Sequence, residues 1–530
     1  MTDRRPLLFT LAGIVATLVY FGAGEFISGA FSATSAPLLI LGQTIIPLVP
    51  TAMIKTAISI FGTNDKLALV ITLVIVGAIL GGVIGRIGLH RRALSFVLLI
   101  GLGILPVVLL LSTGGSFLDA VPALLGVGLG CAVYVGLIRF AGRAEQLSGG
   151  PVDDDVKLDA DAHSGTDLHP GTDRRAFFGL AAGLSVVGIA AIAAGQSAAI
   201  LARNAAGAVT KLVLPRPATS APKIPAGADL NIEGLAPIIT PNDDFYRIDT
   251  ALIPPSVDAA SWSLRIHGMV DEEVTITMDE LLELPLEEHR VSLTCVSNEV
   301  GGDLVGNATW LGYPVRELLK RAKPQDGADM VLSTSDDGFT ASTPLETLTD
   351  DRASLLAVGM NGEPLPRDHG FPARLVVPGL YGFVSATKWV TELEVTRFAD
   401  KEAYWTTRGW STHGPVLVAS RVDVPRAGAQ VNPNKDGQIV TAGMAWAQHV
   451  GIAEVRVRID SGDWHTAELS EELNSDTWRQ WRCAFDDLES GSHTVTVRAV
   501  DADGNVQISE RRPAIPGSAT GLHDRDFTVA

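Results

Sequence analysis

Three cysteines, Cys131, Cys295 and Cys483, are the residues of this sequence best suited to bind a soft metal ion. Their wide spacing gives neither a disulfide framework nor a zinc-binding CxxC pair. Cys131 lies in an apolar run and Cys483 lies in a strand-like segment, so both are expected to be packing residues. Cys295 ends a predicted strand at 291–295 and precedes a glycine-containing loop, where the backbone can approach a bound group closely. Its thiolate is therefore the candidate ligand of a soft metal.

Two sequence blocks resemble the sulfite oxidase family of molybdenum enzymes. The first reads CVSNEVGG from Cys295 and continues as GNATWLG from Gly306. The second reads MNGEPLPRDHGFPARLVVPG from Met360 and is followed by TKW from Thr387. The resemblance covers about 225–510. It implies a molybdenum–molybdopterin cofactor whose protein ligand is Cys295, and an Ig-like C-terminal domain through which family members dimerise.

The resemblance also assigns roles to individual residues. The implied cofactor contacts are Asp243, Tyr246, Arg247, Cys295, Asp336, His369, Arg374, Ser385, Thr387 and Lys388. The implied catalytic residues are Tyr404 and Asn298. The resemblance implies that His369 and Arg374 contact the pterin and that Lys388 lies at its phosphate end, where cationic donors suit an anion. Lys388 taken alone could also be a strand residue whose stem covers apolar surface. Asp336 could equally be an ordinary turn residue before Gly338, and Tyr404 could equally pack beside Trp405.

The sequence departs from the family where sulfite is bound. Sulfite-oxidising members have an arginine five residues after the cysteine, where this chain has Val300. They also have an Arg-Asn-His triplet where this chain has residues 248–250, Ile-Asp-Thr, and Arg247 is one position away, so that on a strand it would face the other way. Each lost arginine hydrogen bond costs about 1.5–3 kcal/mol. We therefore expect a neutral or cationic substrate with a reacting sulfur or nitrogen. The alternatives are a sulfite dehydrogenase with non-standard anion contacts, or a metal-free membrane scaffold or binding protein.

The N-terminal part is strongly apolar. A membrane-spanning helix needs about 20 apolar residues, and five segments satisfy this: 7–27, 67–85, 94–112, 118–138 and 177–199. Residues 38–61 contain prolines and Lys55, so we interpret them as a re-entrant or interfacial segment, with a sixth span as the alternative.

Arginines flank the predicted spans on one side: Arg4, Arg5, Arg86, Arg91, Arg92, Arg139, Arg143, Arg174 and Arg175. Because arginine-rich loops stay in the cytoplasm, five spans place the chain beyond about 200 outside the cytoplasmic membrane. Arg174 and Arg175 precede an apolar run, which also resembles a twin-arginine export signal. The alternative is an ordinary positive flank.

The predicted fold class is an N-terminal α-helical transmembrane domain, an α+β molybdopterin domain of the sulfite oxidase type and an Ig-like β-sandwich. The predicted boundaries are a helical domain at 1–145 (four spans and the re-entrant segment), an acidic linker at 146–172, the signal and fifth span at 173–200, a Pro-rich linker at 201–237, the molybdopterin domain at 238–410 and the sandwich at 411–530. In the second half, mixed strands and helices, including a helix at 311–321, are typical of α+β domains. From about 413, short strands separated by turns are predicted at 438–445, 453–459, 463–468, 481–485 and 493–499, a pattern typical of an antiparallel β-sandwich.

Charge and histidine content limit the partners. The net charge of −18 argues against nucleic acid, because phosphate binding requires a basic surface. His90 is the single histidine in 1–145, and the chain has no CxxCH motif, so no haem is predicted. Electrons are then expected to pass to or from a separate cytochrome or quinone. The other expected partners are the lipid bilayer and a second copy of the chain.

Overall fold

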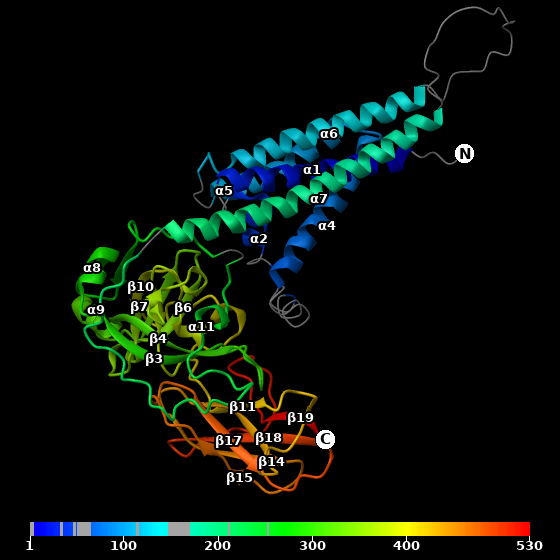
Figure 1. Ribbon diagram of the computed structural model, residues 1–530. Coiled ribbons are helices and arrows are strands. Elements are labelled where there is room, and N and C mark those ends of the chain that lie inside the picture. Colours follow the sequence, from blue (N-terminus) through cyan, green and yellow to red (C-terminus); the bar gives the residue numbers. More distant parts are fainter. Residues whose placement is uncertain are drawn as a thin grey trace, which may run out of the picture. The chain divides into compact units, whose positions relative to one another are not determined.

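The computed structural model describes residues 5–31, 35–45, 49, 53, 65–112, 116–146, 170–209, 212–251 and 254–530. It forms two compact units, Met1–Val209 and Thr210–Ala530, which we describe separately (Figure 1). The first unit is helical, and the second is built mainly from strands.

Five helices of the first unit are long and apolar enough to cross a membrane. They are α1 (Arg5–Phe31), α4 (Asp65–Gly88), α5 (Arg92–Ser112), α6 (Val121–Gln146) and α7 (Pro170–Val209). All five predicted spans lie mainly within these helices. The helix α2 (Pro37–Ile45) has 9 residues and is too short to span. Most of 46–61 and of the predicted acidic linker lies outside the described residues.

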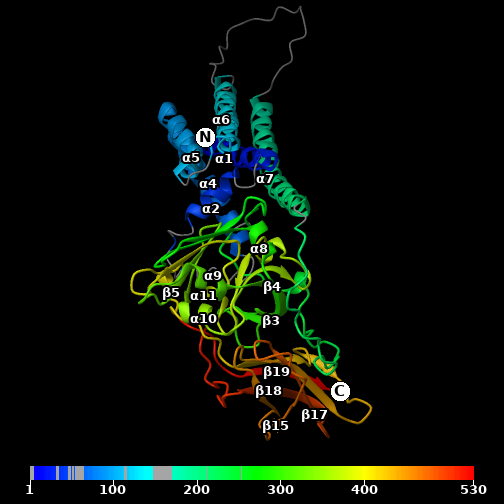
Figure 2. The same ribbon diagram turned by 90° about the vertical axis from the view of Figure 1, so that its left-hand side faces the viewer.

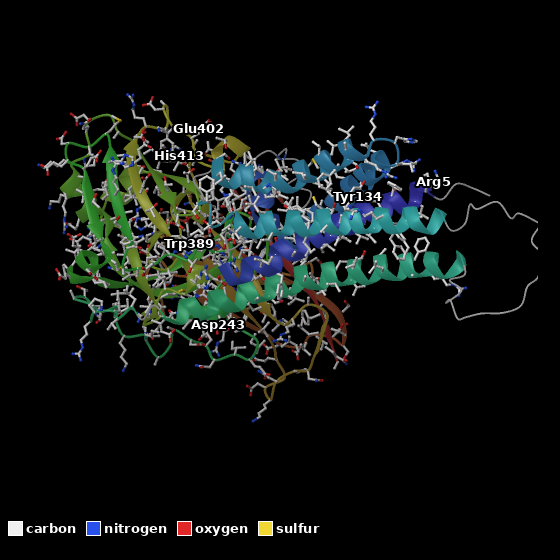
Figure 3. The ribbon with its side chains drawn as sticks, turned by 90° about the horizontal axis from the view of Figure 1, so that it is seen from above. Arg5, Tyr134, Asp243, Trp389, Glu402 and His413 are labelled. Atoms are coloured by element: carbon white, nitrogen blue, oxygen red, sulfur yellow. The ribbon has the colours of Figure 1, made fainter. Side chains whose placement is uncertain are left out.

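Helix α1 packs against α4, α6 and α7. Glycines permit close approach: a Cβ at Gly85 would meet the backbone of Phe9, which is how helices pack tightly in an apolar solvent. Apolar side chains such as Ile79 and Val186 are exposed, and along the middle of these helices most of the side chains in Figure 3 are drawn as carbon. The buried carboxylate of Glu25 accepts hydrogen bonds from the Leu38 N–H and the Gln196 amide.

Two sheets form the first part of the second unit. One has the order β2–β1–β10–β5–β6, and the other has the order β3–β4–β7–β8 with β9 paired to β7. Their strands are β1 (Ser263–Gly268), β2 (Val274–Thr277), β3 (Glu287–Thr294), β4 (Val305–Pro314), β5 (Met330–Ser335), β6 (Thr340–Pro344), β7 (Leu355–Met360), β8 (Glu363–Pro364), β9 (Arg374–Val376) and β10 (Val390–Thr396). Short helices cover them: α8 (Met278–Glu283), α9 (Val315–Ala322), α10 (Leu345–Thr349) and α11 (Gly382–Ser385).

The helix predicted at 311–321 begins later than expected. Residues 311–314 continue strand β4, where they pair with β7, and α9 starts at Val315 after Pro314. Pairing with a neighbouring strand outweighs helical preference here, and proline suits a helix entrance.

Two further sheets form the C-terminal part and share one apolar core (Figure 2). Their orders are β11–β13–β17–β16 and β12–β19–β18–β14–β15. The strands are β11 (Ala419–Val424), β12 (Ala429–Val431), β13 (Ile439–Trp446), β14 (Ile452–Ile459), β15 (His465–Thr466), β16 (Glu468–Leu469), β17 (Arg479–Phe485), β18 (Gly491–Asp501) and β19 (His523–Val529). The predicted strand at 463–468 is divided, because β15 pairs with β14 whereas β16 pairs with β17. Cys483 lies in the shared core.

Side chains of the C-terminal part support the strand that ends at Cys295. The Gln448 amide donates to the Ser292 carbonyl and to the Thr294 hydroxyl. The Trp478 indole N–H donates to the Ile238 carbonyl. The Trp478 backbone N–H also donates to the Ser292 hydroxyl, so the position of β3, and of Cys295 directly after it, depends on the C-terminal part as well.

Candidate cofactor site

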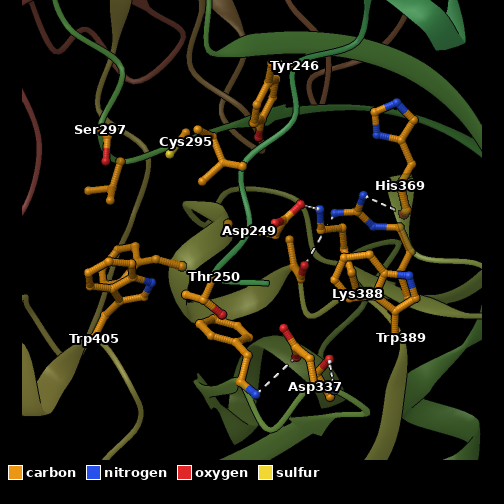
Figure 4. Close-up of a pocket in the computed structure, with 18 of the residues that line it drawn as sticks. Tyr246, Asp249, Thr250, Cys295, Ser297, Asp337, His369, Lys388, Trp389 and Trp405 are labelled. Atoms are coloured by element: carbon orange, nitrogen blue, oxygen red, sulfur yellow. Dashed lines mark hydrogen bonds and ion pairs between the residues drawn. The ribbon is translucent and has the colours of Figure 1, made fainter. Parts of the chain in front are cut away.

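Cys295 and the residues of the second sequence block line one cavity (Figure 4). Cys295 and Ser297 lie on one side of it, and His369, Lys388 and Trp389 lie on the other. The complete lining is Phe245, Tyr246, Ile248, Asp249, Thr250, Cys295, Val296, Ser297, Ser335, Asp337, Phe339, His369, Arg374, Gly382, Phe383, Ala386, Lys388, Trp389, Trp405 and Trp410.

The Cys295 thiol is buried directly after β3. Burial raises its pKa, whereas hydrogen bonds from the backbone N–H and hydroxyl of Ser297 lower it. These two donors would stabilise a thiolate once a metal cation replaced the proton. Ser297 was not predicted as a site residue. Its signal is the position two residues after the cysteine in a tight turn.

Arg374 is a buried cation without an acidic partner among the described residues. Its guanidinium donates to the carbonyl oxygens of His369 and Ala386, and its Cζ lies 5.1 Å from the centroid of the Trp310 ring. Burial lowers its pKa to about 10. A buried charge that meets only carbonyl dipoles is costly, so this site favours an anion.

His369 is neutral. Its Nε2 lies 2.9 Å from the Asn242 carbonyl oxygen, which can only accept, so Nε2 carries the proton. Burial and the Arg374 charge lower the pKa of His369 to about 4. The imidazole therefore adds no positive charge to the cavity near neutral pH.

Lys388, unlike Arg374, is paired. Its Nζ lies 2.8 Å from Asp249 Oδ2 and donates to the Asp368 carbonyl oxygen at 3.0 Å. Arg247 Nε also lies 3.0 Å from Asp249 Oδ2. Burial lowers the pKa of Lys388 to about 8, against the opposing effect of Asp249. Asp249 was noticed in the sequence as a departure from the family, and its pairing with Lys388 was not foreseen.

The structure brings only some of the predicted residues to this cavity: Tyr246, Cys295, His369, Arg374 and Lys388 line it. The other predicted residues do not line this cavity: Asp243, Arg247, Asn298, Asp336, Ser385, Thr387 and Tyr404.

Among these, Ser385 and Thr387 are fully buried and bond to the Tyr381 carbonyl oxygen and the Ser333 hydroxyl. Asp243 and Asp336 are exposed. Asn298 lines a different cavity, and its Oδ1 accepts the Leu304 N–H at 2.9 Å.

An aromatic wall faces the thiol and was missed in the sequence. Trp405 packs against Trp410 with ring centroids 6.0 Å apart, and Trp410 packs against Phe383 at 5.8 Å. The ring centroids of Tyr404 and Trp405 are 5.1 Å apart, and the Arg408 guanidinium lies over the Tyr404 ring. Single aromatic residues give no sequence signal that separates cavity walls from core.

The donor set fits a molybdopterin cofactor. One soft thiol and one uncompensated guanidinium share the cavity, and among the described residues no group of three His, Cys, Asp or Glu could hold a metal by itself. A metal here would need ligands from an organic cofactor besides Cys295. Arg374 supplies the charge that an anionic pterin requires.

Comparison with known proteins supports this interpretation. Residues 251–405 match the family model described as oxidoreductase molybdopterin binding domain. The chain therefore contains a molybdopterin-binding oxidoreductase domain that is similar to that of sulfite oxidases. The matched residues include Cys295, His369, Arg374 and Lys388.

Several curated proteins to which this chain is similar are sulfite oxidases. The mitochondrial enzyme of Drosophila melanogaster is 30% identical over 323 residues, which are 51% of this chain and 55% of the fly protein. The Arabidopsis thaliana sulfite oxidase is 29% identical over 330 residues and 82% of its length. An uncharacterized oxidoreductase of Bacillus subtilis is 29% identical over 170 residues. The chain spans about half the length of the first relatives it matches.

Among solved structures, the sulfane dehydrogenase SoxCD from Paracoccus pantotrophus is similar over 54% of this chain and 80% of that chain. It has a TM-score of 0.47 and 23% identity.

Proposed function

We propose that this chain is a membrane-tethered enzyme whose Cys295 thiolate holds a molybdenum–molybdopterin cofactor for two-electron chemistry on a small substrate with a reacting sulfur or nitrogen. The observation that carries the proposal is the shared cavity of a buried thiol and an uncompensated buried guanidinium, Cys295 and Arg374. When bound, the molybdenum centre supplies oxo transfer between its Mo(IV) and Mo(VI) states.

The protein's own residues have separate tasks in this proposal. Ser297 donates two hydrogen bonds to the Cys295 sulfur and so stabilises the thiolate. Arg374 holds the anionic pterin, and His369 orients the pterin ring. The imidazole of His369 is itself held in place by its hydrogen bond to the Asn242 carbonyl oxygen. The aromatic wall of Trp405 and Trp410 excludes water from the side of the cavity that faces the thiol.

The charges of the cavity favour a neutral or cationic substrate over sulfite. Arg374 is committed to the cofactor, and Lys388 is neutralised by Asp249. Ile248 and Thr250 line the cavity beside Asp249, where sulfite-oxidising members carry arginine and histidine. A dianion would meet the cofactor's negative charge without a free cation to compensate.

We further propose that α1, α4, α5, α6 and α7 tether the enzyme in the membrane, with the catalytic part on the extracytoplasmic side. The hydropathy of these helices and the arginines that flank them support this topology. Electrons then pass to or from a separate cytochrome or quinone, and the C-terminal sheets form an Ig-like domain that could pair two copies.

Metal analysis tests the cofactor site. Molybdenum and pterin are measured in the full chain purified in detergent, in Cys295→Ser and in Cys483→Ser, a matched control with a buried cysteine on β17. Because a serine hydroxyl stays protonated, we expect Cys295→Ser to lose about tenfold or more of its molybdenum. Cys483→Ser should keep the parent content. Equal molybdenum in both variants would refute Cys295 as the ligand.

A dye-coupled screen tests the substrate. Sulfoxides, N-oxides and sulfite are compared on the metal-loaded full chain. Turnover of a neutral sulfoxide or N-oxide supports the proposal, whereas efficient turnover of sulfite favours a sulfite dehydrogenase with non-standard anion contacts. A protein without molybdenum and without activity on any of them would favour a membrane scaffold.

A further inference from the structure

The loop that carries Cys295 separates two cavities. Residues 295–297 line the cofactor cavity, whereas Thr294 and residues 298–301 line a second cavity between this loop and the C-terminal sheets. The second cavity has a volume of about 460 Å³. Sites for small organic ligands have volumes of about 300–1,000 Å³, so its size alone suits such a ligand.

The walls of this interdomain cavity are held in place by hydrogen bonds. Gln507 Oε1 accepts from the Ser420 hydroxyl at 2.6 Å and from the Ala499 N–H at 3.0 Å, and its amide donates to the Gly521 carbonyl. The Tyr381 hydroxyl bonds to the Ser518 hydroxyl at 2.6 Å. A cavity whose polar walls are already satisfied loses little entropy when a ligand enters.

Much of the lining is apolar. It includes Val300, Val416, Leu417, Val418, Trp446, Val450, Val506 and Ile508. Val506 and Ile508 are 51% and 41% exposed, so both are accessible from solvent. These side chains offer an apolar surface to a ligand that enters from solvent.

The charge of this cavity is acidic. Glu299 and Asp501 line it, and no lysine, arginine or histidine does among the described residues. Asp501 is occupied, because its carboxylate accepts the N–H groups of Asp503 and Asn505. Glu299 is exposed, and its carboxylate makes no hydrogen bond or ion pair with any described residue.

We propose that the interdomain cavity binds a small organic cation with an apolar body, such as an alkylammonium compound, with its charge at Glu299 and its body against Val300, Val506 and Ile508. Charge complementarity favours a cation over an anion. The site is distinct from the proposed metal site and does not require the cofactor to be bound.

Calorimetric titration of the full chain in an uncharged detergent tests the proposal. The probes are choline, its uncharged isostere 3,3-dimethylbutan-1-ol and the anion 3,3-dimethylbutanoate. We expect saturable one-site binding of choline that is about fivefold or more tighter than binding of the alcohol, and no binding of the anion. Equal affinity for choline and the alcohol, or binding of none of the three, would overturn the proposal.

Three variants locate the binding. Glu299→Gln keeps the shape and should remove the preference for choline over the alcohol. Val300→Arg places a cation in the cavity and should abolish choline binding. Glu489→Gln removes an exposed acid between β17 and β18, far along the chain from the cavity lining, and should bind choline like the parent. An unchanged preference in Glu299→Gln contradicts the proposal.

Two further measurements separate the possible failures. Sedimentation of the same samples would reveal a dimer, and a dimer whose formation competes with choline would assign the cavity to a second copy and overturn the proposal. Molybdenum content is measured in parallel. Choline binding by a protein that retains no molybdenum would leave this inference standing while the proposed function failed.

Discussion

The two cavities on either side of the Cys295 loop have opposite chemistry. The cofactor cavity contains a thiol and two buried cations, Arg374 and Lys388. The interdomain cavity contains the acids Glu299 and Asp501 and no cationic side chain among its described lining residues. Residues four apart in the sequence therefore face different environments, because the turn after β3 reverses the chain between them.

This difference changes how the sequence departures are interpreted. Val300 stands where sulfite-oxidising relatives carry an arginine, yet it lines the interdomain cavity rather than the cofactor cavity. Asp249, the other departure, lies on the cofactor side and neutralises Lys388. In this chain, Val300 therefore presents an apolar side chain to the interdomain cavity, whereas Asp249 places an anion in the cofactor cavity.

The separation of the cavities depends on the shape of the loop, so its glycine gives the largest expected effect. Gly301 has φ +79°, and a Cβ there would meet the imidazole of His523. We expect Gly301→Ala to lower the free energy of unfolding by about 2–4 kcal/mol. Unfolding in urea is followed by tryptophan fluorescence of the full chain in detergent, because all nine tryptophans lie between 262 and 481.

Gly327→Ala is the matched control for this experiment. Gly327 has φ +85°, and a Cβ there would meet no atom within 4 Å, so only backbone strain is expected. That strain should cost about 1 kcal/mol. An equal decrease in the free energy of unfolding in the two variants would show that the packing of Gly301 against His523 adds nothing to the cost of the substitution.

The next largest effect on stability is expected from the buried ion pair of Lys388 and Asp249 in the cofactor cavity. Lys388→Met removes the buried ammonium from its ion pair with Asp249, whose carboxylate keeps its ion pair with Arg247. We expect a loss of about 2–3 kcal/mol in the free energy of unfolding. Arg247→Met removes the other, 36% exposed partner and should cost about 1 kcal/mol or less.

A double variant sharpens this prediction. Lys388→Met with Asp249→Leu removes both buried charges, so it should be more stable than Lys388→Met alone. If the stability changes of Lys388→Met and Asp249→Leu were simply additive in the double variant, the ion pair between these residues would be disproved.

The smallest expected effect is a pH dependence of the free energy of unfolding that comes from His523. His523 Nδ1 accepts the Val422 N–H at 2.9 Å. Burial lowers the pKa of His523 to about 4, and the positive charges of Arg525 and Arg421 act in the same direction. The carboxylates of Asp423 and Asp524 raise this pKa but do not outweigh the other causes. Between pH 6.5 and 4 the unfolded chain takes up a proton that the folded chain refuses, so stability present above pH 6.5 is lost as the pH falls.

His523→Asn keeps an acceptor for Val422 but cannot titrate in this range. Over this pH window the parent should lose about 1–2 kcal/mol more than the variant in the free energy of unfolding. His369 titrates in the same window in both proteins and cancels in the difference. Parallel pH profiles for parent and variant would show that His523 is not held neutral.

Local patterns were enough to predict several elements. Runs of apolar residues mark α1, α4, α5, α6 and α7, because a helix long enough to cross a membrane must be apolar along its length. Alternation marked β13, β14, β17 and β18, where one face of each strand contacts the shared core. Strands β11, β12 and β19 were not predicted, and neither was the late start of α9, because strand pairing depends on partners far along the chain.

The sequence by itself determined that Cys295 ends a strand before a glycine-containing loop and that two motifs of the sulfite oxidase family are present. Tertiary structure decided which residues share a cavity with that cysteine. It brought Arg374 and Asp249 to the thiol and turned Asn298 and Val300 away from it. The physical reason is that residue types and their spacing are local, whereas the burial and charge that control a site arise from segments more than a hundred residues apart, such as Lys388 and Asp249.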